Sequence, residues 1–216
     1  MPTRNFRYLH VKKTLLKFLD FYIKSSIHVA LSVVSLASIS LSLSQYELSI
    51  SMLIFIFCIA LFAYNFIKFF PIIREITNHD FPYIIFLLSL LCLLLSLYLF
   101  IQLTFLSKIV VVIGGILVLL YTFPMNKGLN NLRNTKGWKV YLVVLTWILI
   151  TVCLPFLSNT IFEIRLFIQL VLIQGIYIYV AILPFDIRDL DSDSTCLNTI
   201  PQKLGVSKSK TLGYVL

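Results

Sequence analysis

Charged residues, and acidic residues above all, are scarce in this sequence. Only 12% of the 216 residues are charged and nine are acidic, whereas 59% are hydrophobic and the mean hydropathy is +0.96. A soluble domain has charged residues at about 25% of its positions. The composition therefore excludes an ordinary water-soluble domain and predicts a protein that lies in a lipid bilayer.

Cysteine and histidine are also rare, with four and three residues. No cysteines are spaced as C-x-x-C, and Cys58, Cys92 and Cys153 fall inside apolar stretches. This arrangement argues against a disulfide framework and against structural zinc. We also find no internal repeat, no Gly-rich phosphate loop and no Ser-His-Asp arrangement, which excludes the common nucleotide-binding and hydrolase motifs.

The sequence contains instead a series of apolar stretches, each long enough to cross the hydrocarbon core of a membrane, about 30 Å thick. The last residues, Thr211–Leu216, are interpreted as the opening of a further span. The fold predicted is all-α, a polytopic transmembrane helix bundle that forms one integral membrane domain over residues 1–216. The six predicted spans are Phe21–Leu43, Leu48–Phe70, Phe81–Ile101, Phe105–Phe123, Val140–Leu157 and Phe162–Phe185.

Lysine and arginine are distributed unevenly between the two sides of the predicted bundle. Sixteen flank one side, and two, Lys108 and Arg165, flank the other. The positive-inside rule places the N-terminus and the segment after the sixth span in the cytoplasm. Because these charges border the spans and form no separate basic domain, we expect the lipid bilayer and no nucleic acid as a partner.

Four of the nine acidic residues lie within eight positions after the sixth predicted span, namely Asp186, Asp189, Asp191 and Asp193. At 100° per residue, the first, second and fourth of these fall within about 60° of one another on a helix. Tyr179 continues that face about two turns deeper. Three carboxylates on one face would offer oxygen ligands to Mg²⁺, which also retains phosphate partners. The spacing alone is equally compatible with a solvated, aspartate-rich loop.

The residues around these aspartates make the pattern more specific. Residues 186–193 read DIRDLDSD, and residues 198–205 read NTIPQKLG. This resembles the second aspartate-rich motif of the UbiA-type intramembrane prenyltransferases, a D-x-x-x-D pair followed by Thr and then Leu-Gly. The resemblance is closest to the branch that prenylates dihydroxynaphthoate in quinone biosynthesis. Asp189 and Asp193 occupy the D-x-x-x-D pair, and Arg188 belongs to the I-R-D start typical of that branch.

A second resemblance lies at the end of the fourth span. Tyr121, Pro124 and Lys127 are similar to the family's Tyr-x-x-Pro-x-x-Lys at a cytoplasmic helix end. There Pro124 would end the helix, and Lys127 would reach a diphosphate as a point charge. Lys127 alone is equally compatible with a basic membrane anchor.

The family's first aspartate-rich motif is only partly present at the end of the second span. Asn65 matches its first position, but Phe69 stands where the family has a carboxylate. Three outcomes stay open: Lys68 neutralises the diphosphate directly, Glu75 or Asp80 replaces the missing acid, or catalysis is lost. The family also has about nine spans, so the chain is interpreted as C-terminally short.

The resemblance implies transfer of a polyprenyl group from a prenyl diphosphate to an aromatic or lipophilic acceptor. It assigns Mg²⁺ to Asp186, Asp189 and Asp193, and catalytic roles to Asp189, Asp193 and Lys127. The substrate-binding residues that it implies are Asn65, Lys68, Tyr121, Tyr179 and Arg188.

Two other functions stay open. One is a non-catalytic UbiA-like membrane protein that binds a lipid or a partner, which the missing carboxylate at Phe69 favours. The other is a small transporter, which would need ionisable groups near the bilayer midplane. The spans offer mainly neutral polar residues there, such as Gln169, Gln174 and Asn65, so this function is the less favoured.

Overall fold

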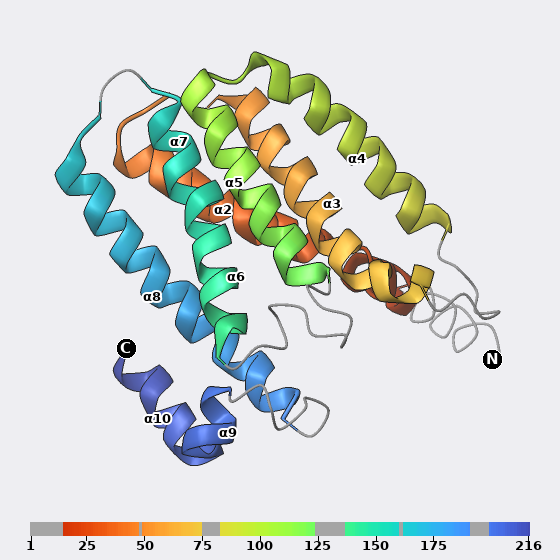
Figure 1. Ribbon diagram of the computed structural model, residues 1–216, viewed down its shortest axis with the longest axis vertical. Coiled ribbons are helices and arrows are strands. Elements are labelled where there is room, and N and C mark those ends of the chain that lie inside the picture. Colours follow the sequence, from red (N-terminus) through yellow and green to blue (C-terminus); the bar gives the residue numbers. More distant parts are fainter. Residues whose placement is uncertain (1–14, 48, 75–82, 124–136, 160–161, 191–198) are drawn as a thin grey trace, which may run out of the picture.

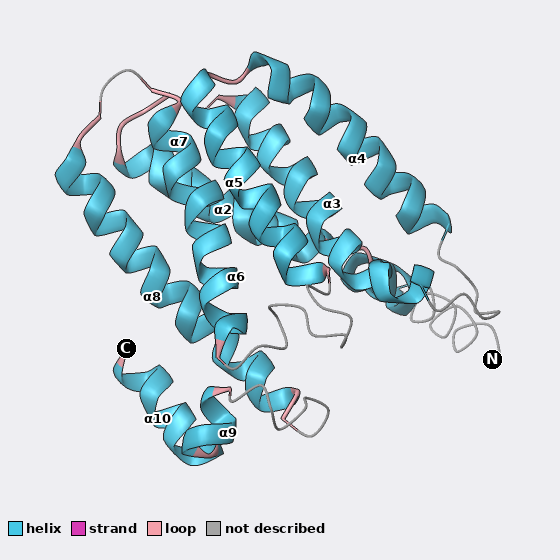
Figure 2. Ribbon diagram, in the orientation of Figure 1, coloured by secondary structure: helices cyan, strands magenta, loops and turns pink. Residues whose placement is uncertain are grey.

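The computed structural model describes residues 15–47, 49–74, 83–123, 137–159, 162–190 and 199–216 (Figure 1). All regular structure within these ranges is helical (Figure 2). Five helices are long and apolar enough to cross a membrane, and a bent helix pair brings the total to six if it counts as one span. The predicted polytopic transmembrane helix bundle is thereby confirmed.

The first predicted span, Phe21–Leu43, is not one straight helix. A helix over Leu15–Lys24 meets α2 (Ile27–Leu43) at an angle of 63°. The turn is made at Ser26, which has a left-handed backbone with φ of 60°. The Lys68 ammonium donates a hydrogen bond of 2.9 Å to the Lys24 carbonyl, one of the carbonyls that a helix end leaves without an intrahelical partner. The hydropathy pattern does not reveal this break, because Ser25 and Ser26 lower the mean hydropathy of the stretch very little.

Four further spans lie where the sequence predicts them, to within a few residues. Thr104 caps one of them, because its hydroxyl accepts a hydrogen bond from the Ser107 backbone N–H at 3.3 Å, as N-cap residues commonly do. These helices are α3 (Ile50–Arg74), α4 (Tyr83–Gln102), α5 (Phe105–Thr122) and α8 (Ile164–Arg188).

The remaining span is continuous but not uniformly α-helical. It runs through α6 (Trp138–Ile148), a π-helical turn η2 (Leu149–Cys153) and α7 (Leu154–Leu157). Pro155 lacks the N–H that would bond to the Thr151 carbonyl, and such a missing bond favours a wider turn.

A neutral polar network ties this π-turn to its neighbours. Gln174 of α8 accepts a 2.6 Å hydrogen bond from the Thr151 hydroxyl and donates bonds of 2.8 Å to Ser40 Oγ and 3.0 Å to the Leu36 carbonyl of α2. These bonds satisfy the buried amide inside the membrane, where an unpaired polar group would be costly.

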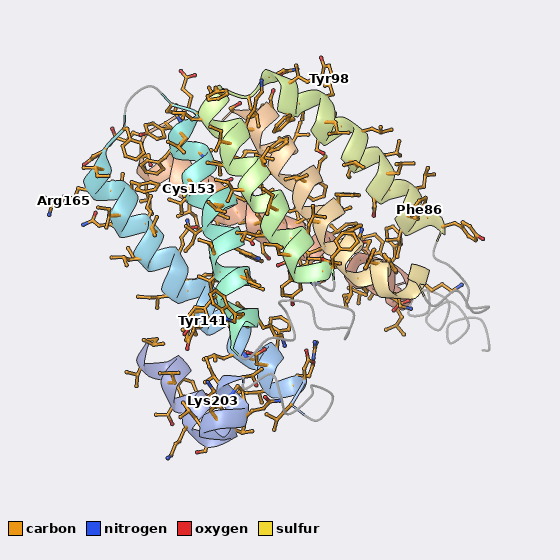
Figure 3. All side chains as sticks on the ribbon, viewed as in Figure 1. Phe86, Tyr98, Tyr141, Cys153, Arg165 and Lys203 are labelled. Atoms are coloured by element: carbon orange, nitrogen blue, oxygen red, sulfur yellow. The ribbon has the colours of Figure 1, made fainter. Side chains whose placement is uncertain are left out.

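Small residues on α2 let it pack closely against α3. Ala30, Val33, Ala37 and Leu41 are all buried and recur at three- and four-residue spacing, which places them on one helix face. On the outside of the bundle the side chains are large and apolar, as Phe86 and Tyr98 of α4 show (Figure 3). An apolar outer surface of this kind faces lipid in a membrane protein.

Two short helices follow α8 and pack against it, α9 (Ile200–Leu204) and α10 (Val206–Val215) (Figure 1). Gly213 permits a close approach, since a Cβ there would lie 3.4 Å from Leu183 Cδ1. Ten helical residues rise about 15 Å, half the hydrocarbon thickness. The segment interpreted as the opening of a seventh span, Thr211–Leu216, lies mostly within this short helix.

Candidate functional site

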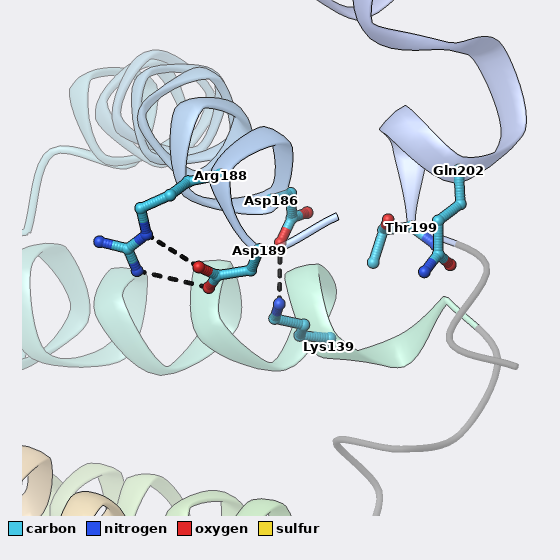
Figure 4. A network of polar contacts seen from close by, with 6 residues as sticks. All are labelled: Lys139, Asp186, Arg188, Asp189, Thr199 and Gln202. Atoms are coloured by element: carbon cyan, nitrogen blue, oxygen red, sulfur yellow. Dashed lines mark hydrogen bonds and ion pairs between the residues drawn. The ribbon is translucent and has the colours of Figure 1, made fainter. Parts of the chain in front are cut away.

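The centre of the charged end of the bundle is an ion pair between α6 and α8 (Figure 4). Lys139 Nζ lies 3.0 Å from Asp186 Oδ1, and the side chains are 12% and 0% exposed respectively. Removing either partner of a buried pair leaves the other charge uncompensated, which costs several kcal/mol. The pair therefore joins the two helices and holds an ammonium in place at the membrane edge.

A second ion pair lies beside it, at the end of α8. The Arg188 guanidinium donates to Asp189 through Nε at 2.8 Å and through Nη2 at 3.4 Å. The side chains are 69% and 29% exposed, so the pair is much more solvated than the first. The forked geometry is the one in which arginine recognises carboxylates and phosphates.

α8 ends at Arg188 with Asp189 as its C-cap, so the helix expected to align the aspartates reaches only the first two of them. Asp191 and Asp193 lie outside the described residues, and their place on a shared face stays a prediction. Thr199, the threonine of the family-like segment, is the N-cap of α9 and lies near Gln202 (Figure 4). Its backbone N–H donates to Gln202 Oε1 at 3.1 Å. Because α9 packs against α8, this part of the segment does return to the aspartate end of the helix.

The described carboxylates do not fit a magnesium site by themselves. In the six described ranges, no group of three His, Cys, Asp or Glu residues is arranged to hold a metal ion. Asp186 and Asp189 each face a cationic side chain of the protein instead. Mg²⁺ needs several converging oxygen ligands, and one of the three predicted ligands, Asp193, lies outside the described residues, so the magnesium site stays a prediction.

Next to this charged end, α3, α5 and α6, with one residue each from α2 and η2, line a partly open cavity of about 410 Å³. Its polar side chains come from Tyr64, Tyr121, Thr146 and Trp147. The remaining lining residues are Val33, Ile59, Ala60, Phe62, Ala63, Phe66, Ile67, Val111, Gly114, Gly115, Val118, Leu119, Leu142, Val143 and Ile150.

The volume of this pocket falls within the range of about 300–1,000 Å³ that is usual for ligand pockets. Its walls are almost entirely apolar, so it suits a hydrophobic molecule better than a polar one.

One hydrogen bond crosses the cavity wall from α6 to α3. Trp147 Nε1 donates to the Tyr64 hydroxyl oxygen at 2.6 Å. The two rings meet edge to face, with centroids 6.4 Å apart and an interplanar angle of 89°, a favourable aromatic arrangement. Both side chains are thus held in fixed positions at the cavity surface.

The cavity and the charged end adjoin each other along α6. Leu142 and Val143 line the cavity, and Lys139 precedes them by about one helical turn. An apolar chamber therefore lies one turn deeper in the membrane than a held ammonium group.

The other predicted substrate residues lie in different places. Tyr121 lines the cavity, whereas Tyr179 of α8 is not among its lining residues. Asn65 is buried and donates from Nδ2 to Ser89 Oγ of α4 at 2.7 Å, so its amide faces away from the chamber. Lys68 bonds to the Lys24 carbonyl, and Lys127 lies outside the described residues.

Sequence reasoning missed Lys139, Tyr64 and Trp147. In the sequence, Lys139 is one of the sixteen basic residues that flank one side of the spans, and no spacing pairs it with Asp186, 47 positions later. A weak signal for Tyr64 and Trp147 is present in the sequence. Both lie inside predicted spans, where the tyrosine hydroxyl and the tryptophan N–H generally need hydrogen-bond partners.

Comparisons of this chain with protein-family models, with curated proteins and with solved structures found no match.

Proposed function

We propose that the protein is a UbiA-like prenyl-transfer protein, which binds a polyprenyl diphosphate and passes the prenyl group to an aromatic or other lipophilic acceptor. The observation that carries the proposal is the apolar chamber of about 410 Å³ lying one turn beyond the held ammonium of Lys139. A lipid diphosphate has the same two parts, an apolar chain and an anionic head. The charge bias of the loops supports a cytoplasmic position for the head-group end.

The head group would meet cations that the protein already holds in place. Lys139 is positioned by Asp186, and Arg188 by Asp189. An ammonium can bond to several oxygens, and a guanidinium matches phosphate in a bidentate manner. The resemblance adds Lys127 and Asp193 to this end, and both lie outside the described residues.

The chemistry proposed is alkyl transfer. The bond between the allylic carbon and the diphosphate oxygen breaks, and the diphosphate leaves with the electron pair. Fixed cations stabilise the charge that develops on the leaving group. The allylic cation then bonds to the nucleophilic atom of the acceptor, which releases a proton. Walls that exclude water protect the cation from hydrolysis, and the Tyr121 ring can stabilise it.

A specific observation favours the non-catalytic alternative. Both described carboxylates of the motif are neutralised by side chains of the protein, and Phe69 replaces the acid of the first motif. A protein of this kind would bind a prenyl lipid and transfer nothing.

Binding tests the proposal directly. Purified protein in lipid nanodiscs is titrated with farnesyl diphosphate, with and without Mg²⁺, and the Kd is measured. Changing Lys139→Gln together with Asp186→Asn removes both charges, so that no buried charge is left unpaired. We expect the Kd to rise roughly 10- to 100-fold, the worth of a charge-assisted hydrogen bond.

The matched control is Lys108→Gln, which removes one lysine at the opposite edge of the bundle and should leave the Kd unchanged. Incubation of the wild type with farnesyl diphosphate and dihydroxynaphthoate then separates the two candidates. Prenylated product supports the enzyme, whereas binding without product supports the non-catalytic relative. Absence of binding, with or without the metal, rejects both.

A further inference from the structure

The Tyr64 hydroxyl in the cavity wall has a hydrogen-bond donor but no identified partner for it in the described residues. The Thr146 hydroxyl donates to the Leu142 carbonyl at 2.7 Å, and Trp147 Nε1 donates to the Tyr64 oxygen. A tyrosine hydroxyl both accepts and donates. Tyr64 therefore still has its own proton to donate, and no side chain or carbonyl in the described ranges receives it.

A water molecule is a poor occupant for this position. A buried water generally needs two to four polar partners, and the walls around Tyr64 are almost entirely aliphatic and aromatic. An apolar hydrocarbon alone would fill the space but leave the proton unpaired, which has a free-energy cost in a dry site. The site suits a molecule that is apolar over most of its surface and presents one acceptor oxygen.

The part of the wall formed by α5 carries two glycines in place of larger side chains. Gly114 and Gly115 of α5 both line the cavity. A Cβ on Gly114 would lie 3.7 Å from Ile150 Cδ1, whereas a Cβ on Gly115 would meet nothing within 4 Å. The pocket therefore reaches the α5 backbone at Gly115, where a larger side chain would occupy part of its volume.

We propose that this cavity binds a compact lipophilic molecule carrying a carbonyl-type acceptor oxygen, which receives a hydrogen bond from the Tyr64 hydroxyl while Trp147 holds that hydroxyl in place. The inference rests on the proposed function, in which the chamber binds a lipophilic substrate. It makes Tyr64 the residue that favours ligands with an acceptor oxygen over plain hydrocarbons. Trp147 is a positioning residue, because it acts on the ligand through Tyr64.

Two probes of similar shape test the hydrogen bond. Benzophenone has two rings joined by a carbonyl, and diphenylmethane has the same rings joined by a methylene group. The chain contains two tryptophans, so Trp138→Phe leaves Trp147 as the only one and places the fluorophore in the cavity wall. Quenching of its emission gives the Kd for benzophenone, and competition gives the Kd for diphenylmethane.

In this background, Tyr64→Phe keeps the ring and removes only the hydroxyl. We expect the Kd for benzophenone to rise roughly three- to tenfold, as for the loss of one hydrogen bond, and the Kd for diphenylmethane to stay unchanged. Tyr98→Phe, which removes a hydroxyl from the outer surface of α4, is the matched control and should change neither value.

Gly115→Leu fills the chamber without a backbone clash and should weaken both probes at least tenfold, provided that the variant elutes as a folded monodisperse protein. The proposal is overturned if the wild type does not bind benzophenone. It is also overturned if Tyr64→Phe changes the Kd values of the two probes equally or changes neither, or if Gly115→Leu leaves both Kd values unchanged. Since no prenyl donor is present, these results are independent of the farnesyl diphosphate titration, and either proposal can fail alone.

Discussion

At the scale of single residues, burial decides what the charges do. Asp186 and Asp189 stand three positions apart in sequence, yet one is enclosed and paired across two helices, while the other is partly solvated and paired with its chain neighbour. A pair exposed to solvent contributes about 0–1 kcal/mol, whereas breaking a buried pair costs much more. Asp186 is therefore the structural aspartate of the segment.

This difference predicts unequal effects of alanine substitution on stability. Asp186→Ala should lower the free energy of unfolding by about 3–5 kcal/mol, because it leaves the Lys139 charge buried and unpaired. Asp189→Ala should lower it by about 1 kcal/mol or less. Thermal and denaturant unfolding in detergent micelles measures both.

The reason can be checked with a double variant. Lys139→Met added to Asp186→Ala removes the unpaired ammonium charge. The double variant should therefore recover most of the free energy of unfolding that Asp186→Ala loses. Equal losses for the two alanine variants, or no recovery in the double variant, would contradict the assignment.

At the scale of elements, hydropathy located the spans but not their irregularities. The bend at Ser26 and the π-turn over Leu149–Cys153 both lie inside stretches that are apolar on average. The bend is accompanied by the hydrogen bond from Lys68 to the Lys24 carbonyl, and the π-turn by the missing N–H of Pro155. A mean hydropathy over a whole span is insensitive to such single hydrogen bonds. The π-turn places Thr151 against Gln174 and so sets how α2, α6 and α8 meet.

We expect Gln174→Leu to weaken this junction moderately. The amide makes three hydrogen bonds to α2 and η2, but Thr151 and Ser40 also bond to carbonyls of their own helices. The loss should therefore be about 0.6–2 kcal/mol, the range for polar contacts between membrane helices. Gln169→Leu, an exposed position on the same helix, is the control for a change in overall hydropathy. A Gln174 variant as stable as the Gln169 variant would show that the network contributes nothing.

At the scale of the whole molecule, the bundle separates two chemical environments along its length. One end carries the Lys139–Asp186 and Arg188–Asp189 ion pairs and the short helices α9 and α10, and the apolar chamber lies next to it along α6. A ligand with a polar head and an apolar body would be oriented by that separation alone.

The orientation proposed for the bundle predicts which end is accessible from the cytoplasm. In a variant whose own cysteines are replaced, Ser207→Cys on α10 should react with a membrane-impermeant maleimide only in inverted vesicles. Glu47→Cys, in the short connection before α3, should react only in intact cells. The opposite pattern would refute the cytoplasmic assignment of the charged end, which depends on the uneven lysine and arginine distribution.

The sequence by itself determined the class of molecule, the approximate bounds of its spans, and the segment where its aspartates gather. These properties follow from hydropathy and charge, which add up locally along the chain. Only the tertiary structure decided that Lys139 holds Asp186, that Trp147 bonds to Tyr64 across 83 positions, and that three helices leave a chamber between them. Such contacts depend on which face each helix turns toward its neighbours. In a membrane protein the lipid-facing and the buried side chains are both apolar, so the hydropathy pattern of a span does not reveal which face is buried.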